Sequence, residues 1–158
     1  MNVPYHPLLI HFPIGFIFAA LILHTIYLFK PNWACRIGSI WLTAFAAFFS
    51  LLASISGQLE FQKALSQNYS PEIVKTLEIH QVMGNMLTWA LIGFIIIWLY
   101  IFFKKMDDKR IDVFAFIALL AITIGIMITS YLGGTLVWEY GVGIRKTIYW
   151  LKTIKKKK

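Results

Sequence analysis

The sequence predicts an all-α membrane protein, an up-down bundle of four transmembrane helices with short interfacial helices. Its composition is the first reason: 59% of the residues are hydrophobic, only 14% are charged, and the mean hydropathy is +0.71. A soluble domain would leave much of this apolar surface in contact with water. The second reason is that four apolar segments are each about as long as the roughly 20 residues that cross a bilayer. They lie near residues 8–29, 37–57, 81–103 and 111–133.

The first segment, residues 8–29, has to be distinguished from a cleaved signal peptide. No basic stretch precedes it, its apolar run is longer than that of a signal peptide, and no small-residue cleavage site follows it. We therefore expect this segment to remain in the protein as the first helix.

The connections between the segments differ in length. Residues 30–36 form a Pro-Asn turn and residues 104–110 a charged hairpin, so the helices that each one joins should be antiparallel neighbours. Residues 58–80 predict a longer polar loop. Within it, Ser70 and Pro71 have the chemistry of a helix start, with Ser as N-cap and Pro at the first helical position. A short surface helix is expected there.

The end of the fourth segment predicts a turn and then a tail. Gly133 and Gly134 are expected to end the helix and to leave Glu139 in a glycine-bounded loop that could fold over the end of the bundle. Residues 1–143 are therefore predicted to be one transmembrane domain. Residues 144–158 mix basic and apolar side chains, which predicts an interfacial helix on anionic lipid. Apart from this charge, nothing supports nucleic-acid binding.

The charges of the loops predict the orientation. The two short loops on one side hold six Lys and Arg residues and the long loop on the other side holds two, which places the amino terminus outside. The basic tail conflicts with this count, because it holds seven Lys and Arg residues on the same side as the amino terminus. We give more weight to the loops, because late charges act after the earlier spans have inserted.

Two histidines are matched in depth at the start of the first and third spans. His11 and His80 are each followed four residues later by a glycine, Gly15 and Gly84, on the same helical face. Axial imidazoles on different helices, with small residues beside them, are how helical bundles hold haem b. This pattern predicts haem b with His11 and His80 as its axial ligands.

A transition-metal site is the alternative chemical interpretation. Three imidazoles and a carboxylate at one membrane face suit zinc, copper or iron, and the set would be His6, His11, His80 and Glu139. A purely structural interpretation stays open as well, because histidines at a membrane edge also cap helix starts or bind water. His24 lies near the opposite face and is expected to be structural.

Three motifs resemble those of a family of bacterial membrane proteins. HPLLIHFPIG, HQVMGN and GGTLVWEYGVG are similar to the signature regions of the family catalogued as domain of unknown function 2231 (DUF2231), and the resemblance covers residues 4–143. Because members occur fused to cytochrome or Rieske modules, it implies a role near redox chemistry, in the inner membrane with the histidine face periplasmic. The family's recurrent polar positions correspond to His6, His11, His80, Asn85, Gly133 and Gly134. This chain carries no such fused module, which favours a subunit or a haem-binding partner over independent redox activity.

These observations predict an integral membrane protein that binds haem b in a redox or respiratory-accessory role. The alternatives are a non-haem metal-binding protein and a structural or assembly subunit without a ligand. An enzyme is disfavoured, because no phosphate loop, nucleophile elbow or HExxH pair is present. A proton or ion path is disfavoured too, because no charged residue is expected deep in the spans. The expected partners are the lipid bilayer, a cytochrome or respiratory-complex subunit, and further copies of the chain.

Overall fold

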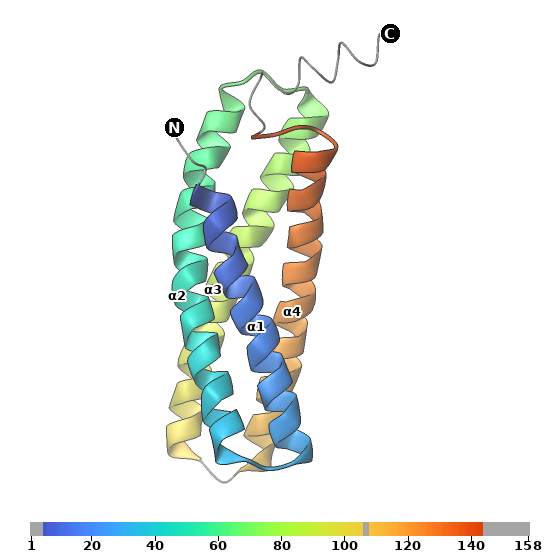
Figure 1. Ribbon diagram of the computed structural model, residues 1–158. Coiled ribbons are helices and arrows are strands. Elements are labelled where there is room, and N and C mark those ends of the chain that lie inside the picture. The colour runs from blue at the N-terminus through green and yellow to red at the C-terminus, as the bar shows by residue number, and fades with distance from the viewer. Residues whose placement is uncertain (1–4, 106–107, 144–158) are drawn as a thin grey trace.

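Four long helices make up the part of the protein that the structure describes (Figure 1). The computed structural model describes residues 5–105 and 108–143. The helices are α1 (Tyr5–Phe29), α2 (Trp33–Leu65), α3 (Pro71–Lys104) and α4 (Lys109–Trp138). Each is long and apolar enough to cross a membrane. The predicted all-α architecture with four spans is thereby confirmed.

The helices form a ring in which each packs against two neighbours. α1 contacts α2 and α4, and α3 contacts the same two helices, so α1 and α3 stand diagonally across the bundle, as do α2 and α4. The chain runs up and down, as predicted (Figure 1). We call the end where α1 and α3 begin and α2 and α4 finish the mouth, and the opposite end the base.

Polar side chains begin three of the helices. Asn32 accepts a hydrogen bond from the Ala34 amide at 2.9 Å, and Asp108 accepts one from the Arg110 amide at 3.0 Å. Such N-caps satisfy amides that have no partner within the helix. Ser70 and Pro71 begin α3 at the predicted position, with Ser70 in extended conformation and Pro71 in the first turn, but the Ser70 side chain makes no capping hydrogen bond.

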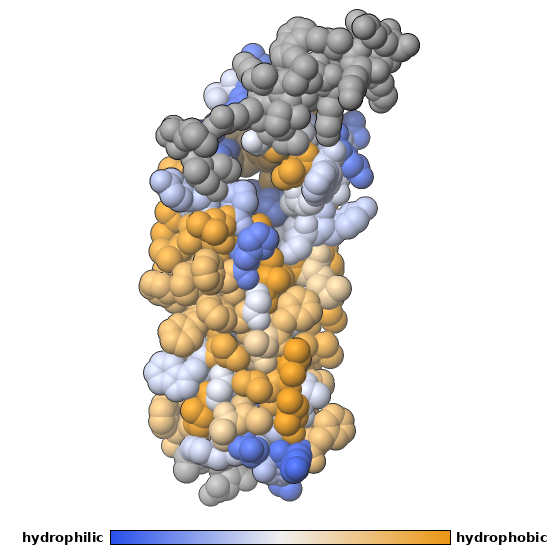
Figure 2. Space-filling model, viewed as in Figure 1, coloured by the Kyte–Doolittle hydropathy of each residue, from blue (hydrophilic) through white to orange (hydrophobic). Residues whose placement is uncertain are grey.

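The predicted loop at residues 58–80 is wrong. α2 continues to Leu65 and α3 begins at Pro71, so only residues 66–70 connect them, and the expected short surface helix is the first part of α3. At about 1.5 Å per residue, helices of 33 and 34 residues are about 50 Å long and exceed the roughly 30 Å of hydrocarbon. Both helices therefore continue into the polar zone, where hydrophilic residues gather at the ends of an apolar band (Figure 2).

The predicted end of the fourth helix at Gly133 and Gly134 is also wrong, because α4 continues to Trp138. A glycine inside a helix costs only about 1 kcal/mol, which packing can outweigh. The turn comes later, where Gly141 and Gly143 have positive φ. The tail predicted at residues 144–158 lies outside the described residues.

Small residues let the helices approach closely, as is typical of membrane bundles. Ala46 and Ser50 of α2 are both buried. At Gly125 of α4, a Cβ atom would stand 2.6 Å from Cδ2 of Leu87, so the absence of a side chain makes room for that residue. The core behind these contacts includes Ile17, Ala20, Leu91, Trp98 and Leu119.

The buried residues show that the chain repeats one helical hairpin. Three of the four buried positions of α1 recur in α3 after 74 residues, and five of the nine buried positions of α2 recur in α4 after 76 residues. The matched pairs are Ile17/Leu91, Ala20/Phe94, His24/Trp98, Arg36/Asp112, Ser39/Ala115, Thr43/Leu119, Ala46/Ile122 and Ala47/Thr123. Because matched helices stand diagonally across the bundle, an approximate two-fold axis along the bundle relates the two halves.

Candidate functional site

His6 lies at the mouth, in the first turn of α1, and its half-buried ring packs against α2. Its Nδ1 atom is 3.0 Å from the carbonyl oxygen of Ala53 and 3.1 Å from Oγ of Ser56. The ring lies over Gly57, where a Cβ atom would stand 2.9 Å from Cε1 of His6. Gly57 therefore provides the space that the imidazole occupies.

His80 repeats this arrangement on the other hairpin. Its Nδ1 atom is 3.1 Å from the carbonyl oxygen of Thr129 on α4, and its ring lies over Gly133, where a Cβ atom would stand 3.0 Å from Cε1. In both hairpins the bonded carbonyl belongs to the residue four positions before the glycine. His6 and His80 are 74 residues apart, so they are a matched pair of the repeat.

The hydrogen bonds assign the same tautomer to both rings. A carbonyl oxygen only accepts, so Nδ1 of His6 and of His80 carries the proton, and in a neutral ring Nε2 is left with a free lone pair. Neither Nε2 atom has a hydrogen-bond partner among residues 5–105 and 108–143. Metal-bound histidines usually donate their other N–H in this way, which holds the ring and its lone pair in place.

The two rings are close enough for a charge on His6 to act on His80, although α1 and α3 do not pack against each other. Polar pairs join α2 to α3 nearby. Ser54 donates to Oδ1 of Asn85 at 2.7 Å, and the side chains of Gln58 and Gln81 are hydrogen-bonded to each other. The mouth therefore combines two fixed imidazoles with a polar surround.

Other predicted site residues lie apart from this pair. His11 is exposed on α1, and Gly15 is exposed too. Adding a Cβ atom to Gly15 or to Gly84 meets nothing within 4 Å, so neither glycine makes room for a neighbour. Successive residues of a helix are turned by about 100°, so His6 and His11 point about 140° apart. The structure thus places His6, rather than His11, near His80.

The four proposed metal ligands are not gathered in one place. Glu139 is exposed at the end of α4, beyond the last helical residue. Within the described part of the chain, no three His, Cys, Asp or Glu side chains are grouped so that they could hold a metal ion. Of the proposed set, His6 and His80 are the two whose rings are held against a neighbouring helix in the described part of the chain.

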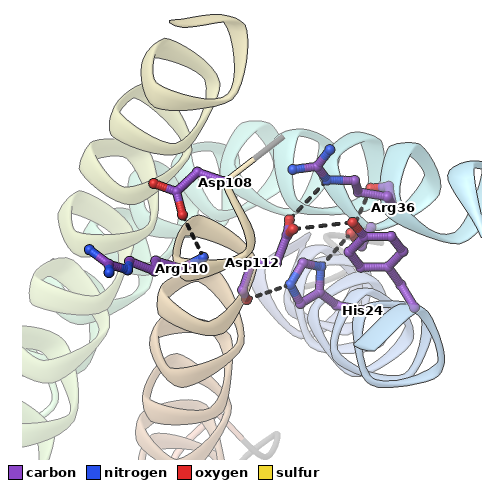
Figure 3. A network of polar contacts seen from close by, with 7 residues as sticks. His24, Arg36, Asp108, Arg110 and Asp112 are labelled. Carbon is purple, nitrogen blue, oxygen red and sulfur yellow. Dashed lines mark hydrogen bonds and ion pairs between the residues drawn. The ribbon is translucent and has the colours of Figure 1, made fainter. Parts of the chain in front are cut away.

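A second polar cluster lies at the base, and the sequence interpretation missed most of it (Figure 3). Arg36 and Asp112 form an ion pair with Nε and Oδ1 2.9 Å apart, and their side chains are 5% and 4% exposed. His24 is fully buried and bonds to both Ser39 and Asp112. Asp112 is the second residue of the predicted fourth span and Arg36 lies just before the predicted second span, so this buried pair stands at the edge of the spans rather than deep within them. Arg36 and Asp112 occupy equivalent positions of the repeat, 76 residues apart, and this equivalence is the signal that could have revealed the pair.

The cation of Arg36 is further surrounded by aromatic rings. Its Cζ atom lies 4.8 Å from the ring centre of Phe102 and 5.4 Å from that of Tyr27. Tyr27 also donates to Oδ2 of Asp112 at 3.1 Å. Cation–π contacts and a charged partner together offset part of the cost of burying a guanidinium group.

Comparison with known proteins adds a family assignment. A family profile described as "Predicted membrane protein (DUF2231)" matches residues 2–146. No curated protein matches the chain. No solved structure matches it either.

Proposed function

The chain belongs to the DUF2231 family of predicted membrane proteins, and we propose that it binds haem b between His6 and His80 at the mouth of its bundle. One observation carries the proposal. Two matched histidines on diagonal helices each donate Nδ1–H to a backbone carbonyl and keep Nε2 available as a ligand. The proposed role is electron transfer, as an accessory protein of a respiratory chain.

The donor set fits haem iron better than a bare metal ion. A six-coordinate haem needs two axial ligands from the protein, because the macrocycle supplies the other four. In this proposal His6 and His80 would hold the haem iron, one from each half of the repeat. A tetrahedral or octahedral metal ion needs more donors than two, and no third His, Cys, Asp or Glu side chain joins them among the described residues.

Each residue around the pair has a defined task in this proposal. Gly57 and Gly133 let the two imidazoles lie flat against α2 and α4. The carbonyls of Ala53 and Thr129 hold the rings in one orientation and raise the basicity of Nε2. Bound haem would supply a one-electron redox centre at the membrane edge.

The position of the site suggests its partners. Four membrane-spanning helices place the protein in contact with lipid, and the proposed electron partner is a cytochrome or a respiratory-complex subunit. The loops at the base carry Lys104, Lys105, Lys109 and Arg110, which favours a cytoplasmic base and a periplasmic mouth in a bacterial inner membrane. Arg36 adds little to this count, because it is buried in an ion pair.

The test is a reduced-minus-oxidised absorption spectrum of the detergent-purified protein, expressed with a supply of haem. The α-band of six-coordinate haem b should be present in the native protein and lost in His6→Ala and His80→Ala. His11→Ala is the matched control, because it removes an exposed histidine from the same helix and should keep the band.

Other outcomes would change the assignment. A band lost in His11→Ala but kept in His6→Ala would restore the pair predicted from the sequence. A colourless protein would overturn haem binding. Elemental analysis of the same sample would then distinguish a bound transition metal from a ligand-free structural subunit.

A further inference from the structure

His24 lies at the base, where hydrogen-bond acceptors face both of its ring nitrogens. Nε2 is 2.8 Å from the carbonyl oxygen of Asp112, and this oxygen can only accept. Nε2 therefore carries a proton. Nδ1 is 3.1 Å from Oγ of Ser39, whose role depends on where its hydroxyl proton points.

The Ser39 hydroxyl has one proton and two candidate acceptors. Oγ of Ser39 is 2.8 Å from the carbonyl oxygen of Arg36, as well as 3.1 Å from Nδ1 of His24. If the proton points to Arg36, Oγ can only accept from His24, and the ring must be a doubly protonated imidazolium. If the proton points to Nδ1, the ring is neutral. The same heavy-atom positions therefore accommodate both protonation states.

The groups that face His24 come from all four helices. Tyr27 is on α1 with it, Arg36 is on α2 and Asp112 is on α4. The α3 helix contributes only the neutral ring of Trp98, whose centre lies 5.2 Å from that of the imidazole at 86°. With Arg36 and Asp112 paired, a protonated His24 gives the cluster a net charge of plus one.

One member of the cluster reaches the surface of the bundle. Tyr27 is only partly buried, and its hydroxyl donates to Oδ2 of Asp112. Asp112 lies in the first turn of α4, which begins at Lys109. His24 lies five residues before Phe29, the last residue of α1. Ionisable groups inside a membrane bundle are costly and commonly mark proton relays.

We infer that His24 is a proton-binding site at the base of the bundle, separate from the histidine pair at the mouth. The proton comes from a hydronium ion in the water at the base: its O–H bond breaks, a water molecule is left, and an N–H bond forms at Nδ1. As it binds, the Ser39 hydroxyl turns from Nδ1 to the carbonyl of Arg36. Release reverses both steps, and no electron is transferred. The site does not depend on haem binding at the mouth.

The test is the ¹⁵N spectrum of histidine-labelled protein in detergent, recorded between about pH 5 and about pH 9, the range around which histidine titrates. The chain has four histidines, so the signals of His24 are assigned by His24→Gln. If that variant does not fold, they are assigned by elimination from variants of His6, His11 and His80. We expect His24 to change between the doubly protonated form and the form with a proton on Nε2 alone.

Ser39→Ala tests the proposed hydroxyl switch. The charged form uses Ser39 both as acceptor from Nδ1 and as donor to Arg36, so its loss should move the midpoint of His24 to lower pH by roughly 0.5–1 unit, as expected for one hydrogen bond. Ser50→Ala is the matched control, because Ser50 is buried and donates to Ala47 at 2.8 Å in the same local geometry. It should leave the midpoint unchanged.

Two results would overturn the inference. One is a His24 ring that keeps a single protonation state over the whole pH range. The other is an equal effect of Ser39→Ala and Ser50→Ala. Neither result bears on the haem spectrum, so this test and that of the proposed function can fail separately.

Discussion

Arg36 and Asp112 occupy matched positions of the two helical hairpins, and their side chains meet 2.9 Å apart in a buried ion pair. They join α2 to α4, two helices that stand diagonally across the bundle and do not otherwise pack together. The repeat therefore places opposite charges where two-fold symmetry brings equivalent positions close to each other. The pair ties the two hairpins together at the base.

Removal of the negative partner should destabilise the protein strongly. Asp112→Asn leaves the buried Arg36 cation without its carboxylate, which typically costs about 3–5 kcal/mol. The free energy of unfolding, measured by circular dichroism in detergent, should fall by that amount. Glu60→Gln is the control, because it breaks the exposed pair with Lys63 and should cost about 1 kcal/mol or less. Equal losses in both variants would contradict a structural role for the buried pair.

The glycines beneath the two histidines should not tolerate a methyl group. In Gly57→Ala and Gly133→Ala the new Cβ would stand 2.9 Å and 3.0 Å from the imidazole rings, so the rings must shift away from their carbonyl partners. Crowding of this kind typically costs about 1–3 kcal/mol, and we expect weaker haem binding in titrations monitored by absorbance. Gly15→Ala has open space around it and should bind haem as the native protein does. Normal binding by both crowded variants would argue against His6 and His80 as ligands.

The hydrogen bond between Ser54 and Asn85 should make a measurable contribution to stability. It joins α2 to α3 at 2.7 Å. A double-mutant cycle of Ser54→Ala and Asn85→Ala, followed by unfolding in detergent, should give a coupling of about 0.6 kcal/mol and at most about 1.7 kcal/mol, the range found for such bonds in membranes. Additive effects of the two substitutions would show that the contact is energetically neutral.

The exposed residues of the originally predicted site should tolerate substitution. His11→Ala and Glu139→Gln change side chains on the surface of the bundle, and such changes usually alter stability by less than about 0.5 kcal/mol. Thermal unfolding of both variants in detergent should resemble that of the native protein. A large loss in either would reveal a contact that their exposure does not suggest.

The sequence by itself determined the four spans, their up-down order and the helix start at Ser70 and Pro71. These features are local, because the length of an apolar run and the chemistry of an N-cap act within one segment of the chain. The same local information placed His6, His11 and His80 at one end of the bundle. It also predicted a helix end at Gly133 and Gly134, which was wrong. Glycine is common both at helix ends and in close contacts between helices, so the residue type alone does not distinguish the two.

Only the tertiary structure decided which of these residues face one another. The depth of a side chain in the membrane follows from its position along the helix. The direction in which it points follows from the rotation of the helix about its own axis, and two residues that are five positions apart point about 140° apart. His11 has the predicted depth and points outward, whereas His6 points to α2 and lies near His80. Arg36 and Asp112 meet for the same reason, because the packing of four helices sets their rotation and no single helix encodes it.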